Sequence, residues 1–209
     1  IFAVDRAGLV GSDGETHQGC FDLTYLSMIP NMTVMAPKNK WELSDMMKFA
    51  VNYDGPIAIR YPRGEAYDGL EEYRAPVLKG RSEMIYEGNS IALLPIGSMV
   101  KTACQVYEML KAEGETPTLV NARFVKPLDE KMLDRLAKEH SLLVTMEENV
   151  QKGGFGSAVL DYMHRHHPQV RVLNIALPDR FIEHGNPEKL KEKAGIDAVS
   201  VYKKIKEAK

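Results

Sequence analysis

The sequence IALLPIGSMV at residues 91–100 decides the fold class. Residues 91–96 are an apolar run with the length of a buried strand, and Gly97-Ser98 then turns the chain into a helix. Apolar residues continue beyond the turn at helical spacing, at Met99, Ala103, Val106 and Leu110. A strand that leads through a short turn into an amphipathic helix is typical of a parallel α/β sheet. Ser98 is the predicted N-cap of this helix.

The same alternation of strand and helix continues on both sides of this stretch. Further strands are predicted at 1–4, 32–35, 57–59, 118–120, 142–146 and 170–175. Helix boundaries are marked by capping residues, which are Asn39, Asp129, Asn186 and Asp197 at helix starts and Gly195 at a helix end. Strands and helices in this order predict parallel sheets with helices on both faces.

The pattern is interrupted between residues 65 and 79, where charges and Pro76 replace the periodicity. We predict a linker there, and therefore two three-layer α/β units with largely parallel sheets, at residues 1–75 and 76–209. The opening run Ile1–Val4 is predicted to be a buried strand without an initiator Met. We therefore expect the chain to begin inside a domain of a longer protein, the alternative being a natural start left after tag cleavage.

Composition excludes several classes of protein. Of 209 residues, 44% are hydrophobic and 27% charged, which is ordinary for a folded globular chain. The 27 basic and 29 acidic residues give a net charge of −2, which argues against a general nucleic-acid binder. No apolar run has the length of a membrane span, and we expect no secretory signal. Two cysteines cannot form a disulfide framework, which indicates a reducing, cytosol-like compartment.

The loop DGETHQG at residues 13–19 is the strongest candidate site. It lies between a strand and a helix, the usual place of ligand sites in parallel α/β sheets. Thr16 is predicted to cap the helix and to leave His17 in its first turn, where the helix dipole favours neutral imidazole and hence proton transfer near pH 7. Asp13 would bind a substrate hydroxyl or orient His17. The alternative is an Asp-Gly turn before a capped helix with a surface histidine.

The strand end RYPRG at residues 60–64 supplies two arginines. One would pair with a structural carboxylate, and the other would reach into the crevice at the strand end and bind a phosphate or carboxylate. An ordinary salt bridge at the edge of the sheet is the alternative.

Four weaker features favour structural roles. Residues 153–156 (GGFG) lack a full nucleotide fingerprint and favour a tight connection to a helix. Cys20 is expected to be a small buried residue rather than a nucleophile. Glu147-Glu148 could act as an acid/base pair, but a solvated or interface edge is favoured. Solvated side chains rather than metal ligands are expected for His164, His166 and His167.

Several motifs together resemble those of one enzyme family. They are FAVDRAGLVG at residues 2–11, DGETHQG at 13–19, IPNM at 29–32, MAP at 35–37, RYPRG at 60–64, EEN at 147–149 with Gly153-Gly154, and LNI at 173–175 with LPD at 177–179. In this order over the whole chain they resemble the 1-deoxy-D-xylulose-5-phosphate synthases, which are transketolase-like enzymes dependent on thiamine diphosphate. The resemblance implies that residues 1–75 are the later half of a pyrimidine-binding domain and 76–209 a transketolase C-terminal domain.

The reaction implied by the resemblance condenses pyruvate with D-glyceraldehyde 3-phosphate and releases CO2, for isoprenoid precursor, thiamine and pyridoxal biosynthesis. Thiamine diphosphate would supply the ylid that attacks pyruvate. By motif, Arg6 and Arg63 would bind the aldehyde's phosphate, Asp13 a substrate hydroxyl, and His17 the reacting oxygen whose proton it helps to move. Arg60 could share the phosphate role and ranks below them.

Other family features are absent from this sequence. No Gly-Asp-Gly motif for magnesium and diphosphate occurs, and the glutamate that activates the cofactor would precede Ile1. We therefore expect the cofactor-binding residues upstream, no metal site here, and a chain that alone binds thiamine diphosphate and Mg²⁺ weakly and is inactive. A homodimer in the cytoplasm, or in a plastid for a plant source, is expected, without nucleic-acid or membrane partners. The alternatives are a β subunit of a 2-oxo-acid dehydrogenase, a non-catalytic dimerisation module and a nucleotide-binding protein.

Overall fold

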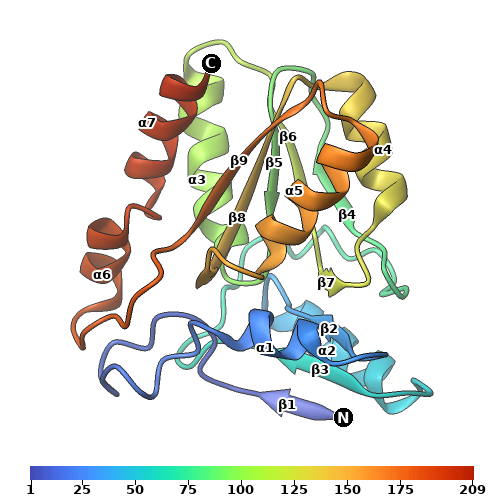
Figure 1. The fold of residues 1–209 in the computed structure, drawn as a ribbon, viewed down its shortest axis with the longest axis vertical. Helices are drawn as coiled ribbons and strands as arrows, with labels where there is room; N and C mark the ends of the chain where they lie inside the picture. The colour runs from blue at the N-terminus through green and yellow to red at the C-terminus, as the bar shows by residue number, and fades with distance from the viewer.

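The larger unit is a five-stranded sheet between two layers of helices (Figure 1). A computed structural model describes residues 1–209. The strand order is β4-β6-β5-β8-β9, and all neighbours are parallel except β4 and β6. These strands are β4 (Glu83–Tyr86), β5 (Ala92–Pro95), β6 (Thr118–Asn121), β8 (Leu142–Val150) and β9 (Arg171–Leu177). The predicted α/β class with largely parallel sheets is confirmed.

Five helices cover this sheet. On one face lie α3 (Met99–Ala112), α6 (Pro187–Ala194) and α7 (Ala198–Ala208), and on the other lie α4 (Glu130–Glu139) and α5 (Phe155–His166). The central strands are covered on both faces, and every residue of β5 and β8 is buried. β5 is a continuous apolar run because neither of its faces meets water, whereas β8 begins with apolar residues and has the buried polar residues Glu147, Glu148 and Asn149 near its end. No helix combines the length and the apolar character that crossing a membrane requires.

The smaller unit is a four-stranded sheet in the order β1-β3-β2-β7. Its strands are β1 (Phe2–Val4), β2 (Thr33–Met35), β3 (Ile57–Arg60) and β7 (Phe124–Lys126), with β7 antiparallel to β2 and the others parallel. Helix α1 (Asp22–Met28) packs toward the larger unit and α2 (Lys40–Val51) on the opposite face. Because β7 comes from the second half of the chain, the two units share a sheet and a core.

A buried cluster of ionic groups joins the two units. Glu42 of α2 accepts from Arg123 Nε at 2.6 Å, from Asn121 Nδ2 at 2.9 Å and from Lys38 Nζ at 3.2 Å. Glu83 of β4 pairs with the same two cations, with Lys38 Nζ at 2.7 Å and Arg123 Nη2 at 3.0 Å. All five side chains are at most 5% exposed. Two cations and two carboxylates cancel, which makes burial of the charges tolerable.

Most predicted boundaries are confirmed. The side chains of Asn39, Asp129, Asn186 and Asp197 accept backbone N–H groups in the first turns of α2, α4, α6 and α7, and Gly195 ends α6 at φ 68°. Residues 65–79 contain no helix or strand. Ser98 is an exception, because its hydroxyl donates to Glu148 rather than capping α3. The division into 1–75 and 76–209 stays a prediction.

The opening strand differs from expectation. β1 forms where predicted and pairs with β3, but it is the edge strand of its sheet, and Phe2 is 53% exposed. The prediction of a buried strand is therefore wrong. An apolar, β-prone run is equally compatible with an edge, since neighbours rather than composition decide burial.

Candidate functional site

The candidate site is built where β1 and β3 end. These two strands are parallel and in register, with Val4 opposite Arg60, so the residues that follow them emerge at the same edge of the sheet. After β1 the chain turns sharply at Arg6, whose φ is 58°. The Arg6 carbonyl accepts the backbone N–H of Gly19 at 3.0 Å, and a Cβ at position 19 would lie 2.3 Å from that oxygen. Only glycine fits there, and the loop between the two residues is closed at its base.

Three of the four predicted site residues converge. Both oxygens of the Asp13 carboxylate accept a hydrogen bond from Arg63 Nη1, each at 2.7 Å. The same carboxylate forms an ion pair with Arg6. The Arg6 and Arg63 side chains are 38% and 53% exposed, whereas that of Asp13 is 18% exposed. The two guanidinium groups therefore face solvent while a carboxylate between them holds them together.

The fourth residue, His17, stands apart from this cluster. Helix α1 begins at Asp22, so Thr16 does not cap it and His17 does not lie in its first turn. That prediction, and the dipole argument based on it, is wrong, because residues 13–18 are used in turns and bends instead. His17 is exposed, and its Nδ1 hydrogen-bonds Thr16 Oγ1 at 3.0 Å. It makes no hydrogen bond or ion pair with Arg6, Asp13 or Arg63.

The two arginines of the RYPRG motif have separate environments, as the sequence indicated. Arg60 is 2% exposed. Its guanidinium donates to the carbonyls of Gly19 and Glu148 at 2.5 and 2.7 Å and to the Asp22 carboxylate at 3.4 Å. These contacts leave it buried and structural. Arg63 is free to meet a ligand on its exposed side.

Gln18 is a residue of the loop whose role the sequence does not predict. Its side chain is nearly buried, and its Nε2 donates to the carbonyls of Ile182 and Glu183 at 2.6 and 3.2 Å. Its Oε1 accepts the backbone N–H of Val10 at 3.2 Å. No spacing could reveal this role, because the partners are main-chain carbonyls 164 and 165 residues away.

A cleft of about 610 Å³ opens beside Arg63 between the two units. Its walls come from both units, including Lys38, Tyr61, Lys101 and Glu148. Arg6, Asp13 and His17 do not line it. Arg63 is thus placed between the ion cluster on the loop and this cleft.

The paired glutamates are not the solvated edge that was predicted. Glu147 is fully buried, and its carboxylate accepts the backbone N–H groups of Phe155 and Gly156, both at 2.8 Å. Burial raises the pKa of Glu147 to about 7, against the lowering effect of those two N–H groups and of Arg60. The first backbone N–H groups of α5 are therefore occupied by the Glu147 carboxylate. Glu148, 3% exposed, accepts from Ser98 and lies 3.5 Å from Lys191 Nζ.

The glycine-rich connection is a close contact, as predicted. A Cβ at Gly154 would lie 2.3 Å from a Glu147 oxygen, and one at Gly156 would lie 2.2 Å from Asn174 Oδ1. Cys20 is buried, which raises the pKa of its thiol to about 12 and confirms a packing role.

Two of the three histidines near the end of α5 make contacts with other side chains. His167 Nε2 hydrogen-bonds Asp134 Oδ1 at 2.7 Å, and the His166 ring stacks on Tyr162.

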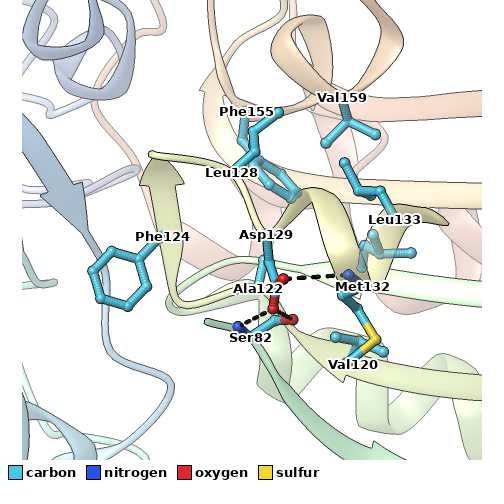
Figure 2. Close-up of a pocket in the computed structure, with 11 residues that line it drawn as sticks. Ser82, Val120, Ala122, Phe124, Leu128, Asp129, Met132, Leu133, Phe155 and Val159 are labelled. Carbon is cyan, nitrogen blue, oxygen red and sulfur yellow. Dashed lines mark hydrogen bonds between the residues drawn. The ribbon is translucent and has the colours of Figure 1, made fainter. Parts of the chain in front are cut away.

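A second, much smaller cavity lies beneath α4 (Figure 2). It measures about 20 Å³ and is lined mainly by apolar side chains such as Leu133, Phe155 and Val159. Figure 2 shows Asp129 accepting from the backbone N–H of Met132 and from Ser82, at 3.2 and 2.8 Å. Space for about one water in an apolar wall is a packing gap rather than a ligand site.

The residues of this chain do not fit a site for Mg²⁺ and the diphosphate of thiamine diphosphate. Such a site needs several oxygen ligands held together around the cation. The chain has no Gly-Asp-Gly, and no three His, Cys, Asp or Glu side chains are grouped to hold a metal ion.

Comparison with known proteins identifies the family. Residues 80–201 match the family described as "Transketolase, C-terminal domain", and residues 1–68 match "Transketolase, pyrimidine binding domain". The chain belongs to the transketolase family. This agrees with the two α/β units described above and with the motifs that suggested the family.

Among members of this family, the chain is similar to proteins named 1-deoxy-D-xylulose-5-phosphate synthase. One from Lachnoclostridium phytofermentans is 54% identical over 206 residues, which are 98% of this chain and 33% of that protein. One from Aquifex aeolicus is 46% identical over 207 residues, which are 99% of this chain and 33% of that protein. The chain thus spans about a third of the length of the curated relatives it matches.

Two solved structures share the architecture. "Split gene transketolase, inactive beta4 tetramer" superposes with a TM-score of 0.86 at 28% identity, covering 99% of this chain and 66% of the other. Transketolase from Campylobacter jejuni superposes with a TM-score of 0.73 at 20% identity and covers 98% of this chain and 31% of the other. This likeness supports the fold alone.

Proposed function

We propose that this chain supplies the aldehyde-phosphate site of a 1-deoxy-D-xylulose-5-phosphate synthase. The reaction condenses pyruvate with D-glyceraldehyde 3-phosphate and releases CO2. The similarity to enzymes of that name over nearly the whole chain supports the reaction. The observation that carries the proposal is the convergence of Arg6 and Arg63 on one carboxylate, because it places two planar cationic donors around one small space.

The charge of the site suits a phosphate monoester. Asp13 neutralises one of the two guanidinium charges and leaves the cluster with a net charge of +1. A phosphate monoester carries about −1.5 to −2 charges at pH 7, so its arrival is electrostatically favourable. Arg6 and Arg63 are partly exposed and retain N–H groups that Asp13 does not use. Asp13 thereby also holds the two forks in place before the phosphate binds.

We assign the remaining polar groups of the loop to the other end of the aldehyde. One oxygen of Asp13 would accept a substrate hydroxyl. His17 Nδ1 hydrogen-bonds Thr16 Oγ1, and Nε2 of this exposed side chain makes no hydrogen bond. Nε2 would bind the reacting oxygen and move its proton, once substrate brings the imidazole and the cluster together.

The cofactor is assigned to regions outside this chain. Thiamine diphosphate and Mg²⁺ would serve the complete enzyme, a cytoplasmic homodimer. The chain alone should neither bind the cofactor tightly nor turn over. The similar structure described as an inactive tetramer of a split-gene transketolase supports this expectation. A calorimetric titration of the 209-residue chain with thiamine diphosphate and Mg²⁺ should give no micromolar binding, and micromolar binding would refute the assignment.

A chimera tests the function itself. This chain would replace the matching segment of the Lachnoclostridium phytofermentans relative, with which it shares 54% identity. We expect the chimera to form 1-deoxyxylulose 5-phosphate from pyruvate and glyceraldehyde 3-phosphate when thiamine diphosphate and Mg²⁺ are supplied. A folded chimera that binds the cofactor but forms no product would contradict the proposal.

A further inference from the structure

The loop at residues 8–21 rests on a segment from the far end of the chain. Three contacts of different kinds join it to residues 178–187. The Gln18 amide donates to the carbonyls of Ile182 and Glu183. The backbone N–H of Gly185 donates to the Gly11 carbonyl at 2.9 Å.

The third contact is apolar. The rings of Phe21 and Phe181 meet edge to face, with centroids 5.6 Å apart. Phe181 is otherwise 64% exposed, so the aromatic contact alone does not anchor the segment. The fit is also tight, since a Cβ at Gly11 would lie 2.4 Å from the Gly185 carbonyl oxygen. The loop is therefore packed closely against the segment and is joined to it by hydrogen bonds.

We infer that Gln18 is a positioning residue, through which segment 178–187 of the C-terminal unit sets the placement of Asp13 and His17. One amide uses both ends in this role, donating twice to the segment and accepting from Val10 within the loop. Hydrogen bonds made by a nearly buried side chain are costly to break without replacement. The C-terminal unit would then help to shape the phosphate site. The effect on phosphate binding rests on the function proposed above.

Gln18 differs from Asp13 and His17 in what it can contact. Its amide is satisfied by main-chain groups on both sides, and the side chain is only 7% exposed. Its effect on substrate must therefore pass through the backbone of the loop. Glu15, by contrast, is exposed on the same loop and has no hydrogen bond or ion pair, which makes it a matched control.

Two measurements on the 209-residue chain test the inference. Gln18→Leu removes the amide while keeping bulk, and Glu15→Gln is the control. We expect amide hydrogen exchange in residues 11–19 to become about tenfold faster or more in Gln18→Leu, because each lost hydrogen bond is worth roughly a factor of five to ten. Exchange in β5 and β8 should stay as in the wild type, which excludes global unfolding. Unchanged exchange in the loop would overturn the inference.

The second measurement follows the arginine Nε–H resonances during a titration with inorganic phosphate. In the wild type and in Glu15→Gln, the Arg63 signal should shift on binding, and in Gln18→Leu the affinity should fall about tenfold. Gln18→Asn, whose shorter amide cannot reach both sides, should behave like Gln18→Leu. If the wild type shows no phosphate shift, the proposed function fails while the exchange result still decides the positioning role. Equal phosphate affinity in wild type and Gln18→Leu would overturn the functional part.

Discussion

Replacing Glu42 by glutamine would break the charge balance of the buried cluster between the two units. The Glu42 carboxylate accepts two hydrogen bonds from Lys38, one from the backbone N–H at 2.7 Å and one from Nζ. It also accepts hydrogen bonds from the side chains of Asn121 and Arg123. In Glu42→Gln the interior holds two cations and only one carboxylate, Glu83. One oxygen that accepts hydrogen bonds also becomes an NH2 group that cannot accept them.

The size of the effect follows from burial. Lys38, Glu42 and Arg123 are each 2% exposed, so solvent cannot screen the unbalanced charge. Removing one partner of a buried ion pair typically costs about 3–5 kcal/mol, and we expect a loss of this size in the free energy of unfolding. The control is Glu139→Gln on α4, where Glu139 is 42% exposed and pairs with Arg135. That change should cost about 0.5 kcal/mol or less.

Urea denaturation measures the difference. Trp41 is the single tryptophan and is next to Glu42 in the chain, so its fluorescence reports on the smaller unit, while far-ultraviolet circular dichroism reports on both. A loss below about 1 kcal/mol in Glu42→Gln, or a loss equal to that of Glu139→Gln, would refute the argument that the cluster holds the units together.

Two further predictions concern buried groups near the site. Burial raises the pKa of Glu147 from 4.5 to about 7, so the folded state binds a proton more tightly than the unfolded state and stability falls as pH rises between these values. Relative to Glu147→Gln, the wild type should lose about 3 kcal/mol of unfolding free energy between pH 4.5 and 7.5, and parallel pH profiles in urea denaturation would argue against it. Arg60→Lys should lower unfolding free energy by about 2–3 kcal/mol because lysine cannot replace three separate contacts, whereas Arg63→Lys, at an exposed site, should change it by less than about 0.5 kcal/mol. Equal losses in the two lysine variants would contradict the separation of their roles.

Much of the fold could be predicted from local signals. Alternating apolar runs and helical stripes predicted the α/β class, and four of the six predicted N-caps formed because a cap depends only on residues within one turn. That Arg60 and Arg63 would have different surroundings was also predictable, since they are three apart on an extended strand end with a proline between them. Which of the two is buried was not predictable, and the burial of Arg60 argues against the expectation that it could share the phosphate role.

The failures involve contacts and turns that no short sequence pattern reveals. Strand β7 is three residues long and pairs with β2 some ninety residues earlier, which no short pattern could indicate. Ser98 has the composition of a cap, but the Glu148 carboxylate competes for its hydroxyl. Glu147 and Glu148 have the composition of a surface edge, yet both are buried: Glu147 accepts the backbone N–H groups of Phe155 and Gly156, eight and nine residues later in the chain, and Glu148 accepts from Ser98, 50 residues earlier. His17 was misplaced because the turns that follow Asp13 delay the start of α1 until Asp22.

The central claim is that Arg63, with Arg6, binds the phosphate of glyceraldehyde 3-phosphate. Its most direct test is kcat/KM of the chimera for that substrate, compared between the chimera and its Arg63→Ala variant. Arg74→Ala is the control, because Arg74 is 46% exposed and makes a comparable ion pair with Asp45 away from the site. We expect Arg63→Ala to lower kcat/KM for glyceraldehyde 3-phosphate by an amount equivalent to about 1–3 kcal/mol, while its KM for pyruvate stays unchanged. In Arg74→Ala, kcat/KM for glyceraldehyde 3-phosphate should stay unchanged. Unaltered kinetics for glyceraldehyde 3-phosphate in Arg63→Ala would contradict the claim.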